Sequence, residues 1–159
     1  MKRPQRKPQR MAGFDYSKPG RYSITICTFL KAPLLGHLIN GRIVLTDIGI
    51  TAAACWEELP EQYHGISIGP MVVMPNHIHG IIEIHTRSSE TDVNLSLPDI
   101  VRNYKAFTAH AYYTKTNQRK LWHRGYFEHV IRDEADYHRI EEYIKCNPAT
   151  WARDKYYLE

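Results

Sequence analysis

The chain has 159 residues, of which 43% are hydrophobic and 24% charged, a composition typical of one globular domain. Its three cysteines have no closely spaced partners, which excludes a disulfide framework or a zinc knuckle. The longest apolar runs are too short to span a bilayer, and the N-terminus lacks the apolar stretch of a signal peptide. We therefore expect a cytoplasmic protein.

The net charge of +4 is concentrated at the N-terminus, where five of the first ten residues are basic: Lys2, Arg3, Arg6, Lys7 and Arg10. Subtracting these five from 21 basic residues leaves 16 against 17 acidic residues, so the remainder is nearly neutral. We predict a basic arm over residues 1–21 and one folded domain over residues 22–159. The arm would favour a polyanion such as DNA by releasing counterions, and a solvated tail is the alternative.

The first half of the chain predicts a strand, a hairpin and a helix. Residues 22–29 are rich in β-formers. Asn40-Gly41 lies between two short apolar runs and is a strong signal for a two-residue turn, because both positions need positive φ. Asp47 is expected to cap a helix that ends at Pro60, with an apolar stripe formed by Ile48, Ala52, Cys55 and Leu59.

Two strands, a loop and a second helix are predicted next. Residues 66–74 form a β run that Gly69-Pro70 interrupts in the manner of a bulge, and a turn at Pro75-Asn76 leads into an apolar run that ends at Ile84. Residues 86–94 are polar and predict a loop. The following helix begins with a capping box at Ser96 and Asp99 and carries the stripe Ile100, Tyr104, Phe107 and Ala111.

Residues 127–131 predict a last short strand, and Asp133 then opens a helix whose apolar side is Tyr137, Ile140 and Ile144. The order is therefore strand, hairpin, helix, two strands, helix, strand and helix. This order predicts a single α+β domain in which helices pack on an antiparallel sheet.

Two patterns in this framework indicate chemistry. His77 and His79 flank one aliphatic residue in a predicted strand, so both imidazoles point to one face and could share a metal ion. Tyr143 and Asn147 are four residues apart in the last predicted helix, so a hydroxyl and an amide oxygen would project side by side. Together they suggest a divalent metal held by His77, His79 and Asn147, with Tyr143 as a nucleophile.

Three segments containing these residues resemble the HUH-type tyrosine transposases, in particular the branch associated with repetitive extragenic palindromic (REP) elements. The segments are residues 74–79 (MPNHIH), residues 121–132 (LWHRGYFEHVIR) and residues 143–148 (YIKCNP). The resemblance covers residues 22–148. It implies a ferredoxin-like fold, Mg²⁺ or Mn²⁺ as cofactor and a 5′-phosphotyrosine intermediate at Tyr143.

The resemblance also implies the partner, which is single-stranded DNA recognised through an imperfect palindromic hairpin and a short adjacent sequence. Basic residues that could contact its phosphates are Arg102, Lys105 and Arg124, in addition to the N-terminal arm. Relatives in this family are monomers or homodimers, and both states stay open. The ligand types alone would equally permit Zn²⁺, Co²⁺ or Ni²⁺.

Alternatives accompany both the residues and the function. Tyr137 is the second candidate nucleophile, with Glu141 four residues later, although Tyr137 lies on the apolar stripe. His85 is too far along the strand to share an ion with the other two histidines. The competing functions are a repressor that binds DNA hairpins without cutting them and a metal-dependent phosphohydrolase in which water attacks.

Overall fold

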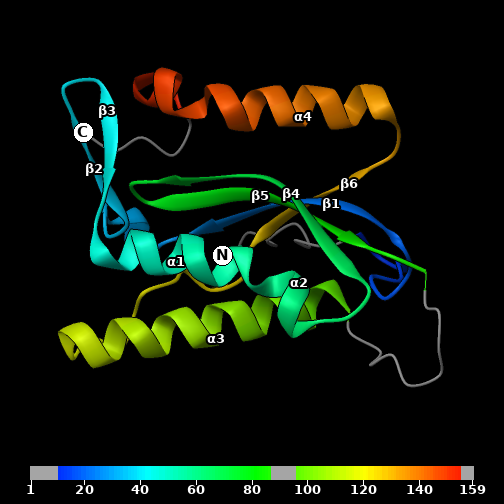
Figure 1. The fold of residues 1–159 in the computed structure, drawn as a ribbon, viewed down its shortest axis with the longest axis horizontal. Coiled ribbons are helices and arrows are strands. Elements are labelled where there is room, and N and C mark those ends of the chain that lie inside the picture. Colours follow the sequence, from blue (N-terminus) through cyan, green and yellow to red (C-terminus); the bar gives the residue numbers. More distant parts are fainter. Residues whose placement is uncertain (1–10, 87–95, 155–159) are drawn as a thin grey trace, which may run out of the picture.

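A four-stranded antiparallel sheet forms the centre of the protein, in a computed structural model that describes residues 11–86 and 96–154 (Figure 1). The strand order is β4-β5-β1-β6. The strands are β1 (Gly20–Cys27), β4 (Ile66–Met74), β5 (His77–Ile84) and β6 (Phe127–Ile131). The predicted basic segment at residues 1–10 and most of the predicted loop at residues 86–94 lie outside the described residues.

Helices cover both faces of this sheet. On one face lie α1 (Asp47–Glu57), the short α2 (Leu59–Gln62) and α3 (Leu97–Thr116), and α4 (Glu134–Cys146) crosses the other face (Figure 1). A small hairpin of β2 (Gly36–Ile39) and β3 (Arg42–Leu45) stands apart from the sheet, and 3-10 turns occupy Phe29–Lys31 and Asn147–Arg153. The order β1-α1-β4-β5-α3-β6 is the βαββαβ pattern of ferredoxin-like domains. The predicted α+β fold is confirmed.

Local backbone signals are confirmed at several points. Asn40 and Gly41 have φ values of 50° and 76° in the β2–β3 turn. The β4–β5 register shifts between Ile68 and Met71, where Gly69-Pro70 was expected to form a bulge. Both hydrogen bonds of the Ser96 capping box are present, and the Asp133 side chain accepts from the backbone N–H of Asp136 at 2.8 Å.

The predicted boundaries of the first helix were wrong. The cap is Thr46, whose hydroxyl accepts from the Gly49 N–H at 3.1 Å and donates to the Leu34 carbonyl at 2.8 Å. Asp47 lies one residue further on, inside the first turn. Pro60 lies in the first turn of α2 rather than at the end of α1, which is allowed because the first residues of a helix need no N–H bond.

The predicted stripe on the second helix was wrong in its second half. Phe107 is 61% exposed, whereas Tyr104, Thr108 and Tyr112 are buried. The buried residues of the second half of the helix are therefore spaced four apart. The indole N–H of Trp122 donates to the Thr108 hydroxyl at 2.8 Å. A buried polar residue held by this hydrogen bond is invisible to an apolar pattern.

The main core lies between the sheet and α1 and α3. Ile24, Ile78 and Ile82 project from the sheet into it, and Trp56 from α1 packs edge-on against Tyr104 from α3, with ring centroids 5.4 Å apart. The described residues before β1 also contribute to it, since the Tyr16 and Tyr22 rings lie 6.0 Å apart. This core places β5 in the middle of the protein.

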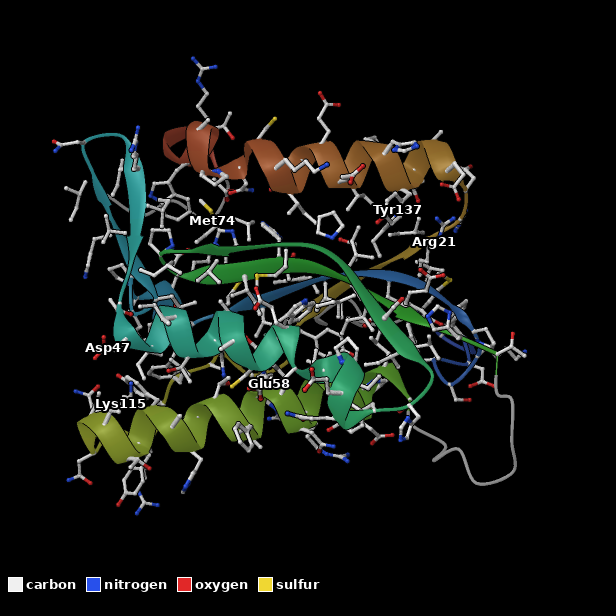
Figure 2. All side chains as sticks on the ribbon, viewed as in Figure 1. Arg21, Asp47, Glu58, Met74, Lys115 and Tyr137 are labelled. Atoms are coloured by element: carbon white, nitrogen blue, oxygen red, sulfur yellow. The ribbon has the colours of Figure 1, made fainter. Side chains whose placement is uncertain are left out.

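The second helical layer uses a smaller apolar contact. Ile144 is 1% exposed and packs with Ile81 and Ile131 of the sheet, a burial worth about 1.5–3 kcal/mol. At the start of α4, the Arg21 guanidinium lies 5.0 Å from the centre of the Tyr137 ring, and Figure 2 shows Met74 of β4 near the opposite, C-terminal end of that helix. With contacts near both of its ends, α4 lies along the sheet face that carries the histidines.

Two further expectations can be compared with the structure. None of Cys27, Cys55 and Cys146 forms a disulfide in the structure. Within residues 11–86 and 96–154, no helix is long and apolar enough to cross a membrane.

Gly80 should be intolerant of a side chain, because a Cβ built there would lie 2.4 Å from Cζ2 of Trp56. We expect Gly80→Ala to lower the free energy of unfolding by about 1–3 kcal/mol through overpacking, measured by urea denaturation. Trp56→Phe removes the atoms that the methyl group meets, so the double variant should lose less than the sum of the two single losses. Strict additivity would refute the contact.

Candidate metal and tyrosine site

The β5 strand carries His77 and His79 on one face of the sheet, as the alternation of side chains in a strand requires. They are 0% and 4% exposed, and their ring centroids are 4.5 Å apart. In the neighbouring strand, Cys27 pairs with His77 and Thr25 with His79. The predicted common direction of the two imidazoles is confirmed.

Each histidine is held through its Nδ1 atom. The Asn76 amide donates to the Lys31 carbonyl at 3.1 Å, so its Oδ1 faces Nδ1 of His77 at 2.8 Å and accepts a hydrogen bond from the Nδ1–H. The Thr25 hydroxyl lies 2.7 Å from Nδ1 of His79. In the tautomer that carries its proton on Nδ1, the ring presents its Nε2 lone pair to a metal ion.

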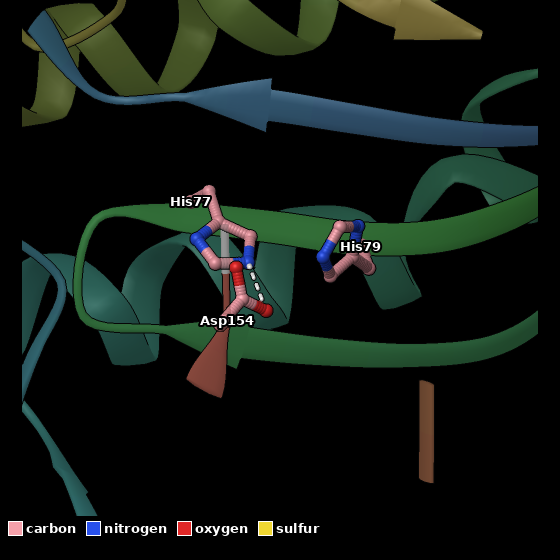
Figure 3. Close-up of side chains that lie close together, drawn as sticks. All are labelled: His77, His79 and Asp154. Atoms are coloured by element: carbon pink, nitrogen blue, oxygen red, sulfur yellow. Dashed lines mark ion pairs between the residues drawn. The ribbon is translucent and has the colours of Figure 1, made fainter. Parts of the chain in front are cut away.

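A carboxylate that the sequence analysis missed completes the cluster. Asp154 follows the 3-10 turn Asn147–Arg153, and one of its oxygens lies 3.9 Å from Nε2 of His77 (Figure 3). Its side chain is only 2% exposed. One ligand atom from each of His77, His79 and Asp154 lies within 4.8 Å of the others. Trp151, whose ring centroid is 5.6 Å from that of His77, packs beside them.

Tyr143 lies beside this cluster on α4. It is 45% exposed, while its neighbour Ile144 is buried, and its ring centroid is 5.3 Å from that of His79. Burial of the hydroxyl raises the pKa of Tyr143 above its usual value, and the negative charge of Asp154 raises this pKa further. The Asn147 side chain acts in the opposite direction and lowers it. The tyrosine therefore combines access from solvent with direct contact to the polar cluster.

Asn147 lies where the helical geometry of α4 ends. It keeps α-helical dihedral angles, with φ −55° and ψ −45°, so it projects on the side of Tyr143 one turn later. It is 1% exposed. Two imidazoles with Asp154, Asn147 or both as the oxygen donor would suit a divalent metal ion and leave coordination positions for phosphate and water.

The other predicted site residues lie elsewhere. The Arg102 side chain pairs with Asp99 at 2.9 Å on the first turns of α3. The Lys105 ammonium donates to the carbonyls of His123 and Gly125, each at 2.8 Å, and so holds the loop before β6. Arg124 is exposed in that loop. The basic residues between Lys2 and Arg10 lie outside the described part of the chain.

The two groups that orient the histidines left different signals in the sequence. Asn76 precedes the first histidine and was interpreted only as a turn residue, although an amide next to a metal-binding histidine could have suggested an outer partner. Thr25 lies 54 residues from His79. Only the pairing of β1 with β5 brings these two residues together.

Comparison with known protein families gives a match to the model described as "Transposase IS200 like" over residues 44–147. An uncharacterized protein from Haemophilus influenzae is 35% identical over 169 aligned positions, which include 97% of this chain and 94% of that protein. The segment matched by the family model, residues 44–147, contains both histidines, Tyr143 and Asn147, and it ends before Asp154.

Two solved structures have a similar fold. A REP-associated tyrosine transposase bound to a REP hairpin has a TM-score of 0.66 at 20% identity, with 92% of this chain and 76% of that chain covered. A proposed transposase from Deinococcus radiodurans has a TM-score of 0.51 at 17% identity, with coverages of 86% and 95%. At these identities the likeness supports the fold.

Thr25→Val should weaken metal binding without unfolding the protein, since valine has the shape of threonine but cannot hold Nδ1 of His79. We expect the affinity for Mn²⁺ to fall by about 10- to 100-fold, the usual effect of losing an outer partner of a metal ligand. The measurement is titration of free Mn²⁺ by electron paramagnetic resonance. Ser23→Ala, two residues away on the same strand face, is the control, and equal affinities in both variants would contradict the role of Thr25.

Proposed function

Because this chain belongs to the IS200-like transposase family, we propose that it cuts and rejoins single-stranded DNA with Tyr143 as the nucleophile. The observation that supports this most directly is the position of Tyr143. Its side chain is about half exposed, and its ring centroid lies 5.3 Å from that of His79, a buried member of the candidate metal cluster. A tyrosine used only for packing would bury its ring, as Tyr104 does at 3% exposure.

In the proposed reaction the Tyr143 oxygen forms a bond to phosphorus as the bond from phosphorus to the 3′ oxygen breaks. The Tyr143 hydroxyl gives up its proton as it attacks, and the departing 3′ oxygen takes up a proton, so the products are a 5′-phosphotyrosine and a DNA 3′-hydroxyl. The phenol, with an ordinary pKa near ~10, leaves more readily than a sugar alkoxide. The same 3′-hydroxyl or another can therefore attack the phosphotyrosine and rejoin a strand without a nucleotide cofactor.

His77, His79 and Asp154 would hold the divalent metal, with Asn147 as an additional or alternative oxygen ligand. The donor set fits such an ion, because two imidazoles fixed through Nδ1 and a buried carboxylate converge within 4.8 Å. When bound, the ion would polarise a phosphate oxygen and offset the charge of Asp154 that opposes ionisation of Tyr143. Mg²⁺ or Mn²⁺ is the proposed cofactor, since the carboxylate favours these ions.

The proposed partner is a DNA strand that folds into an imperfect palindromic hairpin. The similar REP-associated transposase is bound to such a hairpin, and the net charge of +4 favours a polyanion. Phosphate contacts by the N-terminal basic residues, Arg102 and Arg124 remain part of this proposal. Lys105 would contribute chiefly by fixing the loop before β6. Both a monomer and a homodimer stay open as the oligomeric state.

Tyr143→Phe should abolish covalent attachment while leaving hairpin binding nearly unchanged, because the substitution removes one oxygen. We expect wild-type protein with Mn²⁺ to become joined to the 5′ phosphate at the break in a hairpin-bearing strand, and the adduct to appear as a slower band on a denaturing gel. Tyr137→Phe, a matched change on the same helix, should retain the adduct. Cleavage without any adduct would favour the phosphohydrolase, and hairpin binding without cleavage would favour the repressor.

The metal proposal predicts a ranking of variants. His77→Ala and His79→Ala should lose cleavage and measurable Mn²⁺ binding, and chelation by EDTA should have the same effect on cleavage. Asp154→Asn should weaken Mn²⁺ binding more than Asn147→Ala, because a divalent ion prefers an anionic oxygen to an amide. The reverse order would make Asn147 the third ligand, and full cleavage in EDTA would refute metal dependence.

A further inference from the structure

An open groove of about 630 Å³ adjoins Tyr143, on the side of α4 that faces β6. Its floor consists of Ser23 and Thr25 from β1 with Phe127 and His129 from β6, and its wall contains Arg139 and Tyr143. His79 also lines it, so the groove and the candidate metal cluster share a boundary. A volume of this size is within the range of small-ligand sites.

The floor displays an aromatic ring where a strand edge meets solvent. Phe127 pairs with Thr25, which in turn pairs with His79 on its other side. The three side chains therefore share one face of the sheet. Phe127 is 49% exposed, so a planar ligand in the groove could reach this side chain. An aromatic face on a sheet, next to a reactive centre, is a typical platform for a base of single-stranded DNA.

Basic groups lie around this ring. Lys31 and Arg139 line the groove, and Arg139 projects one helical turn before Tyr143. Asp136 forms ion pairs with both Arg139 and His129, the latter at 2.7 Å, and this holds both groups at the rim. Glu128, the acidic residue of the lining, pairs with Ile24 and so belongs to the opposite face of the sheet, with both carboxylate oxygens buried.

A second cavity continues from the groove toward the start of α4. It is about 520 Å³ in volume and shares His129 and Arg139 with the groove, while Arg132 adds a further positive charge. Asp133 and Asp136 also line this cavity, so its two arginines are balanced by two carboxylates. The arginines still offer partners for phosphates beside the aromatic platform, and a DNA strand presents a phosphate and a base at every step.

We propose that the groove holds a nucleobase of the DNA strand next to the phosphate that Tyr143 attacks, stacked on Phe127, with Arg139 contacting the backbone. This inference rests on the proposed function, since it takes single-stranded DNA as the substrate. Phe127 would fix the position of the strand relative to Tyr143. It would thereby select which phosphate is cut, a role separate from hairpin binding.

The test is photochemical crosslinking with a hairpin-bearing strand whose single-stranded flanks are randomised and contain 5-iododeoxyuridine in place of thymidine. Full-length Tyr143→Phe protein is used so that no covalent adduct forms, and crosslinked peptides are identified by mass spectrometry after trypsin digestion. We expect the label on the peptide of residues 125–132, at Phe127. Labelling confined to other peptides would overturn the proposal.

Matched variants separate stacking from other roles of this side chain. Phe127→Ala and Phe127→Leu should each reduce crosslinking at this peptide by about 10-fold or more, the scale of one stacked base, whereas Phe127→Trp should retain it. Phe107→Ala on α3 is the control, since Phe107 is also exposed, at 61%, but lies on the other side of the sheet. Equal yields for leucine and phenylalanine at position 127 would show that apolar contact suffices and would refute stacking.

The backbone contact has its own measurement. Arg139→Gln should reduce the slope of log affinity against log salt by about 0.7, the value for one phosphate contact on a single strand. An unchanged slope would remove Arg139 from the proposed site.

The outcomes distinguish this inference from the proposed function. Crosslinking at Phe127 with a wild-type protein that forms no adduct would refute the tyrosine chemistry and support the groove. An adduct at Tyr143, with crosslinks only on peptides other than residues 125–132, would support the tyrosine chemistry and refute the groove as a base site. A dimer that Phe127→Ala dissociates, with crosslinking unchanged, would make Phe127 an interface between two copies and overturn the groove as a base site.

Discussion

The packing of α4 across the sheet is the contact on which the site depends. Ile144 is buried against Ile81 and Ile131, and a helix fixed in this way has little rotational freedom, since turning it by one residue would expose Ile144 to water. At about 100° per residue, the neighbouring Tyr143 must then project from the flank of the helix. The apolar contact therefore sets the position of the hydroxyl beside His79, although neither of those groups takes part in the contact.

A second constraint is the register of β1 against β5. Because Thr25 pairs with His79, a hydroxyl is available to hold Nδ1 of that ring at 2.7 Å. A shift of one residue would move the histidines to the core face, where Trp56 lies against Gly80. The same glycine that lets Trp56 approach the sheet therefore helps to keep the histidines on the face of α4. Core packing and site geometry are two consequences of one strand register.

The site joins a buried half and an open half. The histidines and Asp154 are nearly inaccessible to water, which strengthens electrostatic interactions among them, while Tyr143 and Phe127 face the groove. Under the proposed function, this division would let the protein hold an ion in the buried half and admit a long flexible substrate from the open side. The polar and aromatic side chains of the groove would then meet the phosphates and planar bases of the proposed DNA strand.

The sequence by itself determined the local patterns: the strand that places two histidines on one face, the helix that places Asn147 one turn after Tyr143, the Asn40-Gly41 turn and the Ser96 capping box. Each depends on residues a few positions apart, where backbone geometry alone fixes the relation. Only the tertiary structure decided that Thr25 holds His79 from 54 residues away and that Asp154 joins the cluster. It also placed Phe127 beside Tyr143, because strand pairing and the turn after α4 depend on packing that no periodicity encodes.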